Sequence, residues 1–307
     1  MAKNLILPRK TVQDIDNRVE RILRGLGNPE PPLRLEDVRE LLNLDLAFYT
    51  ANDPGIAQET ISRIRVAAIQ VYKRPTLLIE AIKKLDLKAL YLPDRKRILL
   101  DGALPLKKHR WNEAHEIGHS LIPWHEEMML GDNNQTLSFE CHEQVEAEAN
   151  FAAGRLLFLR ERFVEEAQSL EPAIKSIRQL HTRFGNTLTT TFYRFIETFG
   201  VEQPLVGLIS CHPHISRRPL AFDVDRPCRY FIQSPAFAGR FSKLSEVELF
   251  EAVAGYCGGQ KGGSLGEAEL ILSDDNGNQH RFYFETFFNH YDALTLGVYC
   301  GPEARIF

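Results

Sequence analysis

Residues 115–119 read His115-Glu116-Ile117-Gly118-His119, a His-Glu-x-x-His pattern inside a stretch that is compatible with a helix. On a helix, the two imidazoles lie one turn apart on the same face, where they can bind one metal ion. Chance produces about 0.03 such patterns in a chain of this composition, so a functional origin is favoured. The pattern therefore predicts metal ligands at His115 and His119.

The His-Glu-x-x-His pattern is typical of enzymes that hydrolyse their substrate with metal-activated water. Zinc takes neutral nitrogen ligands, and a catalytic zinc site keeps one position open for water. The metal lowers the pKa of that water toward about 7 and polarises a substrate carbonyl. Glu116, next to the first ligand, is placed to take the proton from the water. We therefore predict a zinc ion as the cofactor, Glu116 as the catalytic residue and peptide bonds as the target.

Three residues compete for the third ligand position. His125 has the spacing of the extended metzincin motif, but the glycine and the later methionine turn of that motif are missing, so we interpret His125 as a surface residue or a residue behind the ligands. Glu146 and Glu148 flank the apolar face of the next helix, and the helical period barely separates them. Asn150, one turn after Glu146, favours Glu146 because its amide could orient a ligand. The small residues of this helix, Ala149, Ala152, Ala153 and Gly154, would let it approach the histidine helix closely.

Two segments resemble the ImmA/IrrE-type zinc metallopeptidase family: residues 110–119, RWNEAHEIGH, and residues 146–157, EAEANFAAGRLL. The resemblance extends to the preceding hairpin and to a helical pair that follows. It implies a cytosolic endopeptidase that cleaves a DNA-binding transcriptional repressor at a specific site and so switches on transcription, for example under stress. Carried over by position, it also implies the site residues: zinc ligands His115, His119 and Glu146, and catalytic base Glu116.

The composition is that of an ordinary globular protein. Of 307 residues, 44% are hydrophobic and 25% are charged, and the formal net charge is -4. These values exclude a disordered or fibrous chain and argue against a protein whose main partner is duplex DNA. The five cysteines form no C-x-x-C pair, so neither a disulfide framework nor a zinc ribbon is predicted. Because the sequence contains no signal peptide and no membrane-spanning apolar segment, we expect a cytoplasmic protein.

Apolar periodicity predicts an α+β protein of about two domains. A mainly helical metallopeptidase domain with a small hairpin or sheet is expected over residues 1–165, and a helical pair over 166–200. A smaller α+β domain, for which a sensory role is one interpretation, follows over 201–307. Helices are expected near residues 15–26, 35–42, 56–72, 76–85, 107–122, 141–159, 173–181, 188–199 and 245–256. Strands are expected near 46–49, 89–92, 97–100, 205–210, 230–232, 268–272, 281–287 and 294–299.

Alternative interpretations concern DNA, the metal and the substrate. Residues 177–199 fit a helix-turn-helix, but the second helix has one basic residue, Arg194, so a packing role is favoured over DNA binding. A second candidate function is a non-catalytic metal-binding protein that regulates transcription through the helical pair and the C-terminal domain. A fourth protein ligand, such as His125 or Cys141, would indicate such a structural site, whereas an open position would indicate an enzyme. The strand at residues 97–100 is a candidate edge for an extended substrate.

Overall fold

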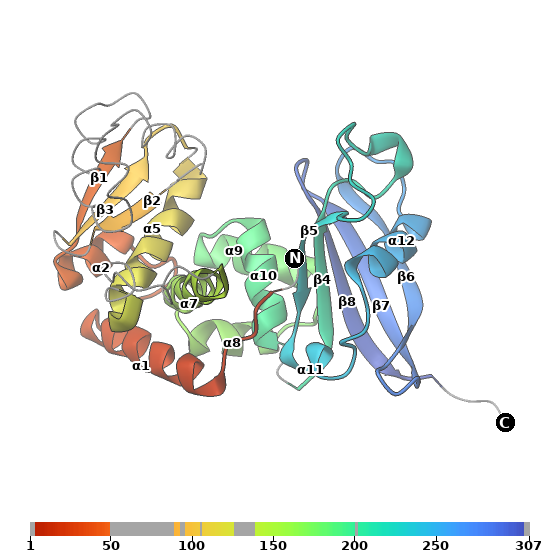
Figure 1. The fold of residues 1–307 in the computed structure, drawn as a ribbon, viewed down its shortest axis with the longest axis horizontal. Coiled ribbons are helices and arrows are strands. Elements are labelled where there is room, and N and C mark those ends of the chain that lie inside the picture. Colours follow the sequence, from red (N-terminus) through yellow and green to blue (C-terminus); the bar gives the residue numbers. More distant parts are fainter. Residues whose placement is uncertain are drawn as a thin grey trace. The chain divides into compact units, whose positions relative to one another are not determined.

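The structure is a computed structural model that describes residues 4–49, 89–92, 96–104, 106–125, 139–199 and 202–303. Contacts divide the chain into two units: residues 7–160 form one, and residues 1–6 with 161–307 form the other (Figure 1). The second unit therefore combines the predicted helical pair with the C-terminal sheet. Each unit mixes helices with a sheet, which confirms the predicted α+β class. The domain limits at residues 165 and 200 stay a prediction.

A three-stranded sheet, in the order β1-β3-β2, belongs to the 7–160 unit. The strands β2 (Ala89–Leu92) and β3 (Arg97–Asp101) pair antiparallel, as the sequence predicts. On its other side, β3 pairs parallel with β1 (Asp45–Tyr49). β3 is therefore the central strand, and the hypothesis that residues 97–100 offer a free edge to a substrate is wrong, because both sides of β3 already carry a partner strand.

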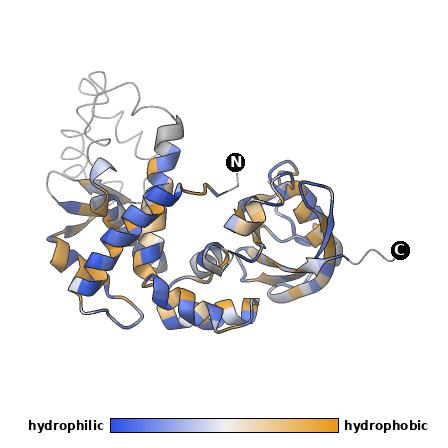
Figure 2. Cartoon of the chain, turned by 90° about the horizontal axis from the view of Figure 1, so that it is seen from below, coloured by the Kyte–Doolittle hydropathy of each residue, from blue (hydrophilic) through white to orange (hydrophobic). Residues whose placement is uncertain are grey.

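The helices of this unit pack through apolar stripes. In α1, buried residues recur one turn apart, at Ile15, Val19 and Leu23. In Figure 2 the helices accordingly carry both hydrophilic and hydrophobic residues. The helices predicted at 56–72 and 76–85 lie outside the described residues. The helices that the structure describes here are α1 (Arg9–Gly25), α2 (Leu35–Leu42), α5 (Leu106–Leu121) and α7 (Phe139–Leu157).

Two ion pairs connect these helices. Arg155 of α7 donates a hydrogen bond to Asp16 of α1. Arg39 of α2 donates to Glu113 of α5 at 2.6 Å. Charged hydrogen bonds with little access to water are stronger than exposed ones, so each pair fixes a flanking helix against α5 or α7. These are the two helices that carry the predicted metal ligands.

At one point α5 and α7 lie in very close contact. A Cβ atom added to Gly118 would lie 2.7 Å from the backbone oxygen of Ala149. Ala149, Ala152 and Ala153 are fully buried, so α7 buries small side chains close to this contact. The expectation that small residues let the two helices approach is confirmed. The contact fixes the position of Glu146, one turn before Ala149, relative to the histidines of α5.

The second unit consists of helices followed by a five-stranded antiparallel sheet. Its strands and helices occur where the sequence predicts them, and the β6, β7 and β8 strands are longer than predicted. Helix α8, the short α11 and the 3-10 helix were not predicted, and α8 is separate from α7 because Leu159 and Arg160 adopt a left-handed backbone conformation that ends α7. The strands in spatial order are β5 (Cys228–Gln233), β4 (Leu205–Ser210), β8 (Ala293–Pro302), β7 (Gln279–Phe288) and β6 (Gly263–Ser273). The helices are α8 (Glu161–Gln168), α9 (Ile174–Phe184), α10 (Leu188–Phe199), α11 (Pro235–Ala238) and α12 (Glu246–Tyr256), with a short 3-10 helix at Ile215–Arg217.

Helix α10 packs on strand β4. Phe192 and Ile196 are fully buried, and a Cβ atom added to Gly207 would lie 2.1 Å from Cδ1 of Ile196. Arg194 is only 5% exposed and lies 3.3 Å from a carboxylate oxygen of Glu197. This contact supports the packing role that the sequence favours for α10. In the part of the chain that the structure describes, every helix is too short or too polar to cross a membrane.

The contact between α5 and α7 predicts an unusual response to a glycine substitution. In Gly118→Ala, the higher helix propensity of alanine alone would stabilise the protein by about 1 kcal/mol. The new methyl group, however, meets a backbone carbonyl that cannot rotate away. Such overpacking costs about 1–3 kcal/mol, so we expect the free energy of unfolding to fall by about 1 kcal/mol in urea denaturation.

The matched control is Gly255→Ala, in the exposed part of α12, where no heavy atom lies within 4 Å of the added Cβ. This substitution should raise the free energy of unfolding by up to about 1 kcal/mol. Equal stabilisation by both substitutions would contradict the close contact.

Candidate metal centre

Three side chains converge beside the contact of α5 with α7: His115 and His119 from α5, and Glu146 from α7. The two Nε2 atoms lie 3.1 Å apart. Oε2 of Glu146 lies 3.2 Å from Nε2 of His115, and Oε1 lies 3.7 Å from Nε2 of His119. The structure thus brings together the three residues predicted as ligands. Within the described ranges, no other group of three His, Cys, Asp or Glu side chains converges in this way.

These separations fit a tetrahedral zinc site. With bonds of about 2.0–2.2 Å, two ligand atoms on a tetrahedron lie about 3.3–3.6 Å apart. The observed separations of 3.1, 3.2 and 3.7 Å are close to this range, so one ion could reach all three atoms with small side-chain adjustments. Two imidazole nitrogens and one carboxylate oxygen are also a donor set of catalytic zinc sites. The residues therefore fit the metal that the sequence predicts.

Asn150 orients the first histidine. Its Oδ1 lies 3.0 Å from Nδ1 of His115. Because an amide oxygen only accepts, Nδ1 carries a proton, and Nε2 is the nitrogen that remains to bind a metal. Burial lowers the pKa of His115, but its hydrogen bond to Glu146 and the charges of Glu116 and Glu146 outweigh burial and raise that pKa. The amide was expected to orient a ligand, and the ligand that it contacts is His115 rather than Glu146.

Glu116 is a buried carboxyl group beside the cluster. Its exposed fraction is 5%. Burial, reinforced by the negative charge of Glu146, raises the pKa of Glu116 to about 7, while His115 and a hydrogen bond from the backbone of Tyr91 act in the opposite direction. The Tyr91 contact ties Glu116 to strand β2, so the sheet helps to position the residue predicted as the base.

His125 and Glu148 lie behind the cluster. Nδ1 of His125 is 3.0 Å from Nδ1 of His119, and Nε2 of His125 is 2.9 Å from Oε2 of Glu148. Both nitrogens of His125 therefore contact groups other than Nε2 of His119, and it is this Nε2 that faces Glu146. The metzincin alternative, with His125 as third ligand, does not fit this arrangement. The Cys141 side chain lies outside the described part of the chain.

Glu146 and Glu148, which the helical period could not separate, have different partners in the structure. Glu146 contacts both imidazoles of α5, and its side chain is 40% exposed. Glu148 is 2% exposed and accepts from Trp124 and Gln144 as well as contacting His125. Burial raises the pKa of Glu148, but these hydrogen bonds outweigh it and lower that pKa. Sequence reasoning missed this network, although a tryptophan five residues and a histidine six residues beyond the motif were a signal for it.

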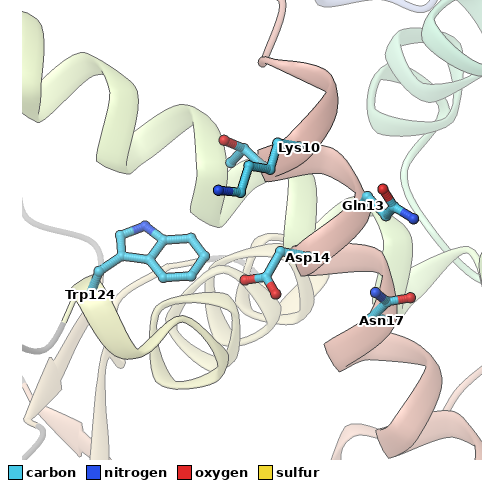
Figure 3. Close-up of a pocket in the computed structure, with 6 residues that line it drawn as sticks. Lys10, Gln13, Asp14, Asn17 and Trp124 are labelled. Carbon is cyan, nitrogen blue, oxygen red and sulfur yellow. The ribbon is translucent and has the colours of Figure 1, made fainter.

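The indole of Trp124 also faces the protein surface. Figure 3 shows its ring opposite side chains of α1, including Lys10 and Asp14. The guanidinium carbon of Arg18 lies 5.5 Å from the ring centroid. The Trp124 ring borders a surface hollow, which is lined by Lys10, Thr11, Gln13, Asp14, Asn17 and Trp124. The network behind the cluster therefore ends at this hollow.

The chain is similar to known proteins in sequence and in fold. Residues 69–195 match the model of the M78 peptidase family, described as an IrrE N-terminal-like domain, which confirms the resemblance seen in the sequence. A solved structure of a Mycobacterium tuberculosis transcriptional regulator is similar to the chain, with a TM-score of 0.53 and 16% sequence identity. The similarity covers 94% of this chain and 76% of that one. At this identity it shows a shared fold. No curated protein matches the sequence.

If Glu146 is the ligand from α7, its removal should weaken metal binding selectively. Glu146→Ala is expected to lower the affinity for Zn²⁺ more than about 100-fold, because loss of a direct ligand exceeds the effect of a residue behind the ligands. Competition with a chromogenic chelator measures this affinity. Glu143→Ala, an exposed carboxylate on the same helix, is the control and should leave the affinity unchanged. Equal affinities of the two variants would show that Glu146 is not a ligand.

Proposed function

We propose that this chain is a zinc-dependent endopeptidase that cleaves a cytosolic protein at a specific site. The observation that carries the proposal is the convergence of Nε2 of His115, Nε2 of His119 and the Glu146 carboxylate, with the buried Glu116 carboxyl beside them. These residues would hold the ion. Zinc bound there would supply an activated water and polarise the substrate carbonyl.

Glu116 performs the proton transfers in this mechanism. It takes a proton from the attacking water and later returns it to the leaving amine of the cleaved peptide bond. Its burial favours this role, because burial brings its pKa close to neutral, where a carboxyl can both accept and release a proton. The backbone of Tyr91 holds the carboxylate in place.

The exposure of the cluster favours a catalytic over a structural metal. The Glu146 side chain is 40% exposed, so solvent reaches the cluster at this residue. The described residues contribute three ligand atoms and no fourth, since both nitrogens of His125 are engaged elsewhere. Three protein ligands with an open position are typical of catalytic zinc, whereas structural sites are closed. A closed site with four protein ligands would instead have favoured the alternative, a non-catalytic regulatory protein.

A DNA-binding transcriptional repressor is the proposed substrate. The resemblance to ImmA/IrrE-type peptidases supports it, together with the fold shared with a protein described as a transcriptional regulator. In this proposal the 7–160 unit performs the cleavage, and the sheet of the second unit has a sensory role.

Substitution of the base separates metal binding from hydrolysis. Glu116→Gln should bind zinc with unchanged affinity, because Glu116 is not among the ligand atoms, and should lose at least about 100-fold in cleavage rate. His119→Ala should lose both properties. Chelator competition and a cleavage assay measure the two quantities, and full activity of Glu116→Gln would overturn the assigned base.

The substrate proposal predicts selective cleavage. The zinc-loaded protein, incubated with a repressor encoded by a neighbouring gene, should yield two defined fragments by mass spectrometry and should leave casein intact. Glu116→Gln serves as the control for contaminating proteases. Digestion of casein at many sites would instead indicate a protease of broad specificity.

A further inference from the structure

We propose that Glu148 and His125 are positioning residues that act through His119: they form a buried hydrogen-bond relay that fixes the tautomer and the orientation of this second metal ligand. The inference rests on the proposed metal site and names two residues that neither the motif nor the family match assigns. The relay runs from Oε2 of Glu148 through Nε2 and Nδ1 of His125 to Nδ1 of His119, with separations of 2.9 and 3.0 Å.

The direction of the relay follows from the neighbours of Glu148. The Trp124 indole only donates, and its Nε1 lies 2.6 Å from Oε2 of Glu148. Nε2 of Gln144 donates to the other oxygen, Oε1, at 2.9 Å. Both oxygens of Glu148 therefore accept hydrogen bonds, which makes Nε2 of His125 the third donor to this carboxylate.

The proton positions along the relay then follow one from another. With its proton on Nε2, neutral His125 has an acceptor lone pair at Nδ1. His119 must donate to that lone pair, so its own proton is on Nδ1. Nε2 of His119 is left with a lone pair, directed at the atoms of His115 and Glu146 that complete the cluster. The relay thus leaves His119 in the only neutral tautomer that binds a metal through Nε2.

Burial makes the relay effective. His125 is fully buried, and Glu148 and His119 are 2% and 6% exposed. In such surroundings hydrogen bonds between polar groups are stronger than in water, and a polar group without a hydrogen-bond partner would lower the stability of the fold. The first ligand is supported differently, since the hydrogen-bond partner of Nδ1 of His115 among the described residues is the neutral amide of the exposed Asn150. We therefore expect His119 to be the more rigidly held of the two imidazole ligands.

Zinc affinity tests the relay without any substrate. By competition with a chromogenic chelator, His125→Phe should bind zinc about 10- to 100-fold more weakly than the natural protein, and Glu148→Gln about 10-fold more weakly. The double variant should bind no more weakly than His125→Phe, because Glu148 acts through His125. Glu143→Gln is the matched control and should be unchanged. Circular dichroism of the metal-free variants verifies that each is folded.

The tautomers provide a spectroscopic test on the unaltered protein. Long-range proton–nitrogen NMR of zinc-loaded, ¹⁵N-histidine-labelled protein, assigned through the backbone signals, should show His125 protonated at Nε2 only and His119 at Nδ1. A proton on Nδ1 of His125 would overturn the relay even if the variants failed to fold, and so would unchanged zinc affinity in folded His125→Phe. Absence of zinc binding by the natural protein would overturn the proposed function itself, so the two failures are distinguishable.

Discussion

The close contact between α5 and α7 is the constraint on which the rest of this unit depends. Gly118 leaves no room for a side chain against the backbone of Ala149, and further fully buried alanines follow along α7. This separation places the Glu146 carboxylate within 3.2 and 3.7 Å of the two imidazoles. A larger residue at position 118 would push α7 away and move Glu146 from the two histidines, and zinc bonds of about 2.0–2.2 Å leave little room for such a shift.

Much of the fold could be predicted from the sequence because its signals are local. The period of Ile15, Val19 and Leu23 indicates α1, and alternating or continuous apolar runs indicate the strands. The parallel partner of β3 could not be predicted, because β1 is more than forty residues away in the sequence and a strand carries no mark of its partner. The break at Leu159 and Arg160, which separates α8 from α7, was also missed, since neither residue favours a left-handed backbone.

The candidate site shows the same limit. The His-Glu-x-x-His spacing predicts two ligands and the adjacent glutamate, because all three residues lie on one helix. The choice between Glu146 and Glu148 depends on how two helices are rotated against each other, which a helical period of about 3.6 residues does not determine. The structure gives Glu148 a buried partner in His125, and the two glutamates differ in exposure accordingly. Unequal support of the two histidines, by an exposed amide and by a buried carboxylate–imidazole pair, is a property that no sequence pattern reveals.

The central claim is that α5 and α7 hold one ion and leave it open to solvent. A crystal structure of the zinc-loaded protein tests it most directly. The account predicts zinc within about 2.0–2.2 Å of Nε2 of His115, Nε2 of His119 and a Glu146 oxygen, with a water molecule as the fourth ligand. A zinc ion bound by Glu148, His125 or Cys141, or enclosed by four protein ligands, would contradict it.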